Sequence, residues 1–154
     1  AVAYEITSTG QARRLLPQPL ADTLGWAMFQ TDDAETDRLL EAARQRFLSP
    51  KPDDRQDALE KLWDAFERLK TLELGANKRA QADALLDRVA AAGSGFREAL
   101  GREAAELTSI GNSFRIRHSE TTQEALTSLD QFDYLFTRMF AFVRIILKGT
   151  GRGG

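Results

Sequence analysis

The stretch DDRQDALEKLWDAFERLKTLEL, residues 53–74, decides the fold expected of this 154-residue chain. Pro50 and Pro52 precede it, and Gly75 and Asn77 follow it, so a helix here has both a start and a stop signal. At the α-helical period its large apolar side chains fall within one arc, and these are Leu59, Leu62, Trp63, Phe66 and Leu69. We therefore predict a long amphipathic helix that buries one face against neighbouring helices.

Helical periodicity continues on both sides of this stretch. Four more helices are predicted, over residues 31–48, over 79–92, from 96 to between 111 and 118, and over 130–148. The last one is apolar over more than half of its circumference, which predicts burial on two sides, in the domain centre or across a subunit interface. The expected fold class is an all-α bundle of four to five helices.

The first sixteen residues follow a different pattern. Val2, Tyr4 and Ile6 alternate with smaller or polar residues, and the turn-forming residues 8–10 come next, which predicts a short β-hairpin or an extended arm. Residues 20–29 show no clear period. The expected organisation is an N-terminal arm, hairpin and connector over residues 1–30, a helical domain over 31–148 and a flexible tail over 149–154.

Composition excludes several classes of protein. The chain has no cysteine and one histidine, which excludes a disulfide scaffold, a thiol nucleophile and a multi-histidine metal cage within one chain. Its 21 basic and 23 acidic residues give a net charge of −2, which argues against a broadly basic surface but permits a local basic patch. No signal peptide or membrane span is apparent, and we expect a cytoplasmic protein without metal, cofactor or membrane contact.

The string IGNSFRIRHSE, residues 110–120, gathers the groups best suited to chemistry. The lone histidine, His118, titrates near neutrality and can move a proton. Arg115 and Arg117 can hold a phosphate and stabilise developing negative charge, while Asn112 and Glu120 can support them. The set is typical of metal-independent phosphodiester cleavage. The alternative is purely structural: His118 hydrogen-bonds a helix end and the two arginines face solvent or pair with Glu120.

This string and the sequence KLWDAFERLK at residues 61–70 resemble HEPN domains, the helical bundles of abortive-infection, toxin–antitoxin and CRISPR-associated proteins. The resemblance spans about residues 53–148. It implies a metal-independent endoribonuclease of a prokaryotic defence or toxin–antitoxin system, acting on RNA as a homodimer with a composite Arg/His site. His118 would then be the general acid and base, and Arg115 and Arg117 would hold the scissile phosphate. A cognate antitoxin or a larger defence-system partner is also implied.

The chain departs from the family pattern in one respect, because residues 111–113 are Gly, Asn and Ser where that pattern has an arginine. Two alternatives to the enzyme follow. One is a non-catalytic HEPN-like dimerisation module that binds RNA, a nucleotide or a protein. The other is a structural helical domain of a larger assembly.

Lys70 is a further candidate, because the helical period places it inside the apolar arc with Trp63 and Phe66. It could point into a phosphate-binding cleft. Alternatively, its stem packs on the core near the helix C-terminus while its ammonium group reaches water.

Overall fold

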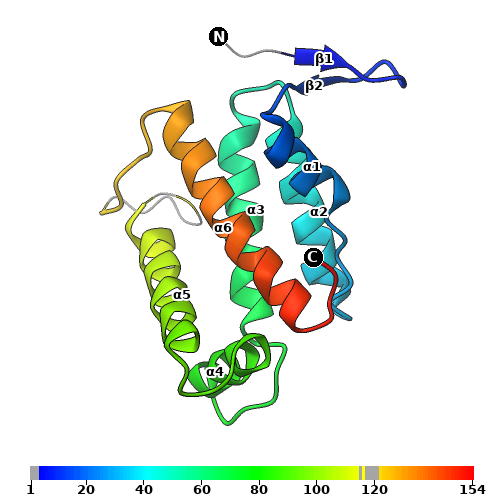
Figure 1. Cartoon of the computed structure of the whole chain (residues 1–154). Coiled ribbons are helices and arrows are strands. Elements are labelled where there is room, and N and C mark those ends of the chain that lie inside the picture. The colour runs from blue at the N-terminus through cyan, green and yellow to red at the C-terminus, as the bar shows by residue number, and fades with distance from the viewer. Residues whose placement is uncertain (1–3, 115, 117–121) are drawn as a thin grey trace.

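The computed structural model describes residues 4–114, 116 and 122–154. Over these residues the chain forms a small β-hairpin followed by six helices (Figure 1), in agreement with the predicted all-α bundle. The strands are β1 (Tyr4–Ile6) and β2 (Ala12–Arg14), and the helices are α1 (Gln18–Trp26), α2 (Ala34–Leu48), α3 (Asp54–Leu69), α4 (Lys78–Val89), α5 (Gly95–Ser113) and α6 (Leu129–Gly149). No helix in the described part of the chain is long and apolar enough to cross a membrane.

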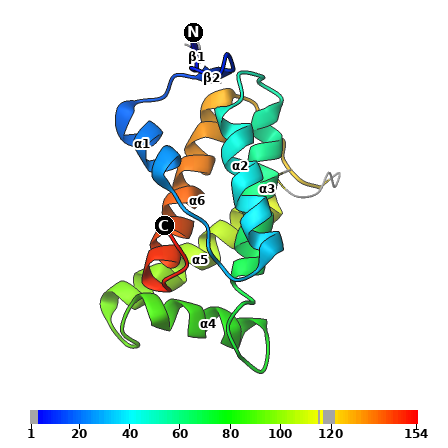
Figure 2. The same cartoon turned by 90° about the vertical axis from the view of Figure 1, so that its right-hand side faces the viewer.

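Helix α3 is the centre of the bundle, with α2 and α6 packed along it (Figures 1 and 2). The predicted apolar arc is confirmed, because all five of its large side chains, from Leu59 to Leu69, are fully buried. Helix α6 is also confirmed as a broadly apolar element, with eight buried residues. Its second buried side is satisfied within the single chain, so the width of its apolar face does not require a subunit interface.

Three helices differ from the sequence prediction: α1 is not predicted, α3 ends earlier than expected, and α4 ends at Val89 and not at residue 92. Helix α1 forms over residues that show no clear period. The period is absent because only Leu24 is buried on this helix, while the apolar Trp26 is 74% exposed. Helix α3 ends at Leu69, five residues before the predicted end at Leu74. Leu74 is 94% exposed, so continuing the helix to that point would bury no further apolar surface there.

The last residues of the chain are held in place, which differs from the flexible tail expected over 149–154. The Gly154 amide donates to the Met28 carbonyl at 2.9 Å, and the Gln30 amide donates to the Arg152 carbonyl at 2.9 Å. Gly153 has a φ of 107°, and a Cβ atom there would overlap the Met28 carbonyl. Only glycine fits this turn.

The hairpin pairs in antiparallel register, with Tyr4 opposite Arg14, and a buried ion cluster attaches it to the bundle. Arg14 is 7% exposed and donates to both carboxylate oxygens of Asp133 on α6, at 2.6 and 3.2 Å. Arg55 on α3 is 2% exposed and donates from Nε to Asp133 Oδ1 at 3.3 Å. The Arg14 guanidinium also lies 4.8 Å from the centroid of the Phe47 ring on α2. One carboxylate therefore joins the arm, α3 and α6.

Replacing Asp133 by Asn removes the only carboxylate that the structure shows between these two arginines, leaving buried positive charge without compensation. We expect a loss toward the lower end of the about 3–5 kcal/mol typical of breaking a buried pair, because the Asp133 side chain is 33% exposed. Urea unfolding of Asp133→Asn beside Asp130→Asn, an exposed carboxyl in the same helical turn, measures the difference. Equal losses in the two variants would contradict the assigned role.

Trp63 sets the spacing between α3 and α5. Its indole Nε1 donates to the Leu107 carbonyl at 2.8 Å. Its ring also lies against Gly111, where a Cβ atom would fall 2.5 Å from Trp63 Nε1. Gly111 is therefore needed for close helix packing, which explains a residue of poor helix propensity within α5.

Gly111→Ala should destabilise the protein by about 1–3 kcal/mol, the usual cost of overpacking a core. The matched control is Gly101→Ala in the same helix, where the added Cβ meets only the movable Arg97 guanidinium at 3.2 Å. That control should be neutral or stabilising by up to about 1 kcal/mol, since alanine favours helix. The two free energies of unfolding check this prediction, and a stabilised Gly111→Ala variant would refute it.

Candidate functional site

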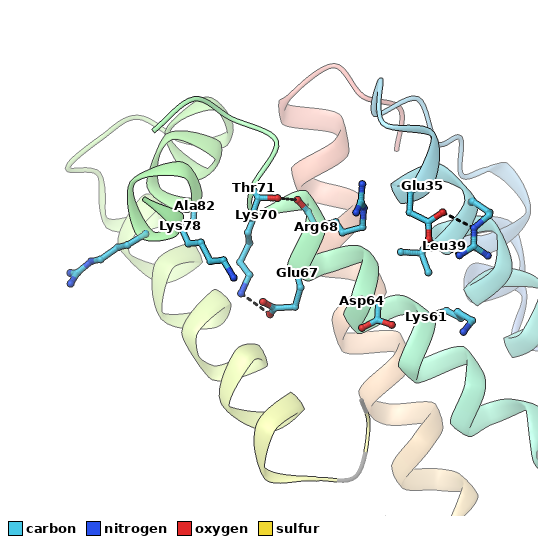
Figure 3. A pocket seen from close by; sticks show the side chains of 12 residues that line it. Glu35, Leu39, Lys61, Asp64, Glu67, Arg68, Lys70, Thr71, Lys78 and Ala82 are labelled. Carbon is cyan, nitrogen blue, oxygen red and sulfur yellow. Dashed lines mark hydrogen bonds and ion pairs between the residues drawn. The ribbon is translucent and has the colours of Figure 1, made fainter. Parts of the chain in front are cut away.

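One hollow on the described surface is a groove of about 790 Å³ whose walls come from α2, α3 and α4 (Figure 3). Basic side chains dominate the groove, against three acidic ones at Glu35, Asp64 and Glu67. The basic lining residues are Arg38, Lys61, Arg68, Lys70, Lys78 and Arg79. This is the local basic patch that the net charge of the chain permits.

Besides Lys70, which pairs with Glu67, three of these cations have a carboxylate partner along the α2 and α3 walls. Arg38 pairs with Glu35 at 2.6 Å. Arg68 pairs with Asp33 at 2.9 Å, and Lys61 lies 3.5 Å from Asp57. These pairs reduce the positive charge that the two walls present to a ligand.

The α4 wall is different. Lys78 and Arg79 are exposed, and neither forms an ion pair with any residue that the structure describes. They occupy the first turn of α4, directly after the cap residue Asn77. Cations at a helix N-terminus oppose the helix dipole, so their placement costs stability unless an anion neutralises them. This feature points to an anionic ligand.

Lys70 lies between the walls. It agrees in part with both expectations from the sequence, namely a lysine that lines a cleft and a lysine whose stem packs on the core. Its Nζ donates to Glu67 Oε1 at 2.7 Å and to Thr108 Oγ1 on α5 at 2.9 Å. It also lies 4.6 Å from the centroid of the Phe66 ring, so its stem packs on the core as the structural alternative predicts. Lys70 nevertheless lines the groove, and Figure 3 shows its side chain and that of Lys78 reaching toward the same region.

Four of the sequence-predicted site residues, Arg115, Arg117, His118 and Glu120, lie outside the described residues. The fifth, Asn112, is exposed in the last turn of α5. Its carbonyl accepts a hydrogen bond from Gln123 Nε2 at 3.2 Å.

The ends of this string are nevertheless fixed. The Glu124 amide donates to the Ser113 carbonyl at 3.1 Å, so a residue beyond the string meets the end of α5. Gln56 on α3 donates from Nε2 to the Ile116 carbonyl at 3.3 Å, and Ile116 is 1% exposed. Ile116 is thereby attached to α3, the helix that also carries one wall of the groove.

Sequence reasoning identified Lys70 but missed the rest of the groove. Lys78 and Arg79 carried a detectable signal, because two cations directly follow the helix cap Asn77. Arg38 and Lys61 carried none, since each looks like an ordinary solvent-facing charge until α2 and α3 are placed together. Among the described residues, no group of three or more His, Cys, Asp or Glu side chains is arranged to hold a metal ion.

No protein-family model, curated protein or solved structure matches this chain.

Asp33 makes the stability of the α2 wall depend on pH. The hydrogen bond from the Thr36 hydroxyl, together with the Arg68 guanidinium, holds the pKa of the Asp33 carboxyl below its usual range. A lowered carboxyl pKa stabilises the fold above the ordinary aspartate value of about 3.9, and this stabilisation is lost as pH falls through the native pKa.

Asp33→Asn keeps a residue able to cap α2 but removes the titration. We expect the variant to unfold at lower urea than the wild type at pH 5, and the difference to shrink at pH 2.5. A difference that stays constant between the two pH values would refute this account.

Proposed function

We propose that this protein is a HEPN-like RNA-binding module whose groove between α2, α3 and α4 holds the phosphate backbone. The observation that carries the proposal is the pair Lys78 and Arg79, two cations at a helix N-terminus that line the groove with Lys70 and form no ion pair with any described residue. Helix N-termini and converging cations are the usual partners of phosphate groups. The sequence resemblance supports RNA as the source of those phosphates.

The groove recognises backbone rather than bases. None of its lining residues, all of them described, is aromatic, so the groove has no platform on which a base could stack. Binding that depends on phosphate contacts is insensitive to sequence and falls steeply with salt. We therefore expect mixed-sequence RNAs of equal length to bind with similar affinity.

Endoribonuclease activity is the second candidate. In this proposal His118 acts as general acid and base, Arg115 and Arg117 hold the scissile phosphate, and Asn112 and Glu120 support them in a homodimer. The bond from Gln56 to the Ile116 carbonyl supports it, because it attaches Ile116, which lies between Arg115 and Arg117 in the sequence, to α3. Backbone held in the groove would then lie along the same helix that binds Ile116.

The test of binding uses fluorescence anisotropy with labelled mixed-sequence RNA in EDTA. The double variant Lys78→Glu/Arg79→Glu should bind at least about tenfold more weakly, and its salt dependence should lose about 0.7 in slope for each phosphate contact removed. Its melting temperature should be unchanged or higher, because glutamates favour a helix N-terminus by about 0.3–1 kcal/mol each.

The matched control, Lys51→Glu/Arg102→Glu, reverses two exposed charges outside the groove. Equal weakening in both double variants would show that only net charge matters and would overturn the groove assignment.

Cleavage is tested in the same samples by gel, with the oligomeric state measured by light scattering. Loss of cleavage in a folded His118→Ala variant that still binds RNA supports the ribonuclease. Cleavage that survives this change removes the histidine from the mechanism. Groove-dependent binding without cleavage in the wild type supports the non-catalytic module.

A further inference from the structure

A second hollow, of about 530 Å³, lies between α1 and α6 and shares no lining residue with the basic groove. Figure 2 shows α1 beside α6 on the side of the bundle that faces the viewer. The surface of this hollow is mainly apolar. It is formed by Leu20 on α1 and by Phe140, Ala141 and Ile145 on α6. A concave apolar site of this size is within the range that holds small organic ligands.

Two cations stand on the α6 side of this hollow. Arg144 and Lys148 are four residues apart, so they lie on the same face of the helix, where like charges destabilise it. Neither side chain forms an ion pair or hydrogen bond with the residues that the structure describes, and Arg144 Nε is buried without a partner. No acidic residue is found among the lining residues, all of which are described.

The two threonine hydroxyl groups of the pocket already donate hydrogen bonds within the protein. Thr23 Oγ1 donates to the Pro19 carbonyl at 2.7 Å, and Thr137 Oγ1 donates to the Asp133 carbonyl at 2.7 Å. Both hydroxyl protons are therefore engaged within their own helices. The groups that remain for a ligand are an apolar surface and two cations at one side of it.

We propose that this pocket binds an amphiphile with an acyl chain and an anionic head group. The chain lies against Leu20, Phe140 and Ile145, and the head group neutralises Arg144 and Lys148. An uncharged apolar ligand would leave both cations unpaired, and a cationic one would be repelled. A free fatty acid and an anionic membrane lipid share this chemistry, and the experiment separates them.

The first measurement is calorimetric titration of the full chain with octanoate, decanoate and dodecanoate, each below its micelle concentration. Affinity should rise by up to about fourfold for each added methylene while the chain still fits the pocket. Decanol and decyltrimethylammonium, which have the same chain with a neutral or a cationic head, should bind at least about tenfold more weakly than decanoate, since hydrogen bonds to charged groups contribute that much.

Two variants locate the site. Arg144→Met/Lys148→Met removes both charges while keeping side-chain length, and Ala141→Trp fills the pocket from an exposed position. Each should weaken decanoate binding at least about tenfold. The matched controls are Lys51→Met/Arg102→Met and Ala105→Trp, which place the same changes at exposed positions elsewhere, and they should bind as the wild type does. Circular dichroism confirms that every variant is folded.

Vesicles distinguish the two sources of the ligand. Co-sedimentation with phosphatidylglycerol vesicles, but not phosphatidylcholine vesicles, that is lost in both pocket variants assigns the pocket to a membrane lipid. Decanoate binding without sedimentation assigns it to a free fatty acid. The proposal is overturned if neither probe binds, if decanol binds as well as decanoate, or if the pocket variants bind like their controls. None of these variants changes a residue of the basic groove, so the RNA-binding proposal can fail or succeed independently of this one.

Discussion

Trp63 fixes how α5 lies on α3, and both parts of the candidate site depend on that contact. The indole hydrogen bond to the Leu107 carbonyl and the absence of a side chain at Gly111 set the separation of the two helices. At this separation, Thr108 is placed to accept from Lys70, which positions the lysine in the groove. Beyond the end of α5, the Ile116 carbonyl accepts a hydrogen bond from Gln56 on α3. A larger residue at Gly111 would move both features together.

The distribution of paired and unpaired charge separates structural cations from those free to bind a ligand. Arg14 and Arg55 are buried around one carboxylate and hold the fold together. In contrast, the pairs Lys78–Arg79 and Arg144–Lys148 have no partner among the residues the structure describes, and each pair borders a hollow. The chain has more acidic than basic residues, yet none of the described carboxylates pairs with these four cations. The two hollows also differ in character, since charged side chains predominate in the groove while the second hollow is mainly apolar, so they suit different anions.

The helices were predictable from sequence where one face alone is buried, as in α3, whose five large apolar residues share an arc. Helix α1 was not, because Pro19 and Gly25 weaken the helical signal and the exposed Trp26 obscures its period. Lys70 could be found from its angle on the helix, but Arg38 and Lys61 belong to the groove only because α2 and α3 are adjacent. The role of Arg55 depends most clearly on tertiary structure. A charged residue on the buried side of a helix can be explained only when its partner Asp133, on another helix, is known.

The burial of the Arg14–Asp133–Arg55 cluster has a consequence for how the molecule responds to ionic strength. Dissolved ions screen exposed charges over about 10 Å at 0.1 M salt but reach buried pairs far less. The attachment of the hairpin to the bundle is therefore less sensitive to salt than the exposed Lys78 and Arg79 are. If the groove binds a polyanion as proposed, concentrated salt would release it without a rearrangement of the backbone.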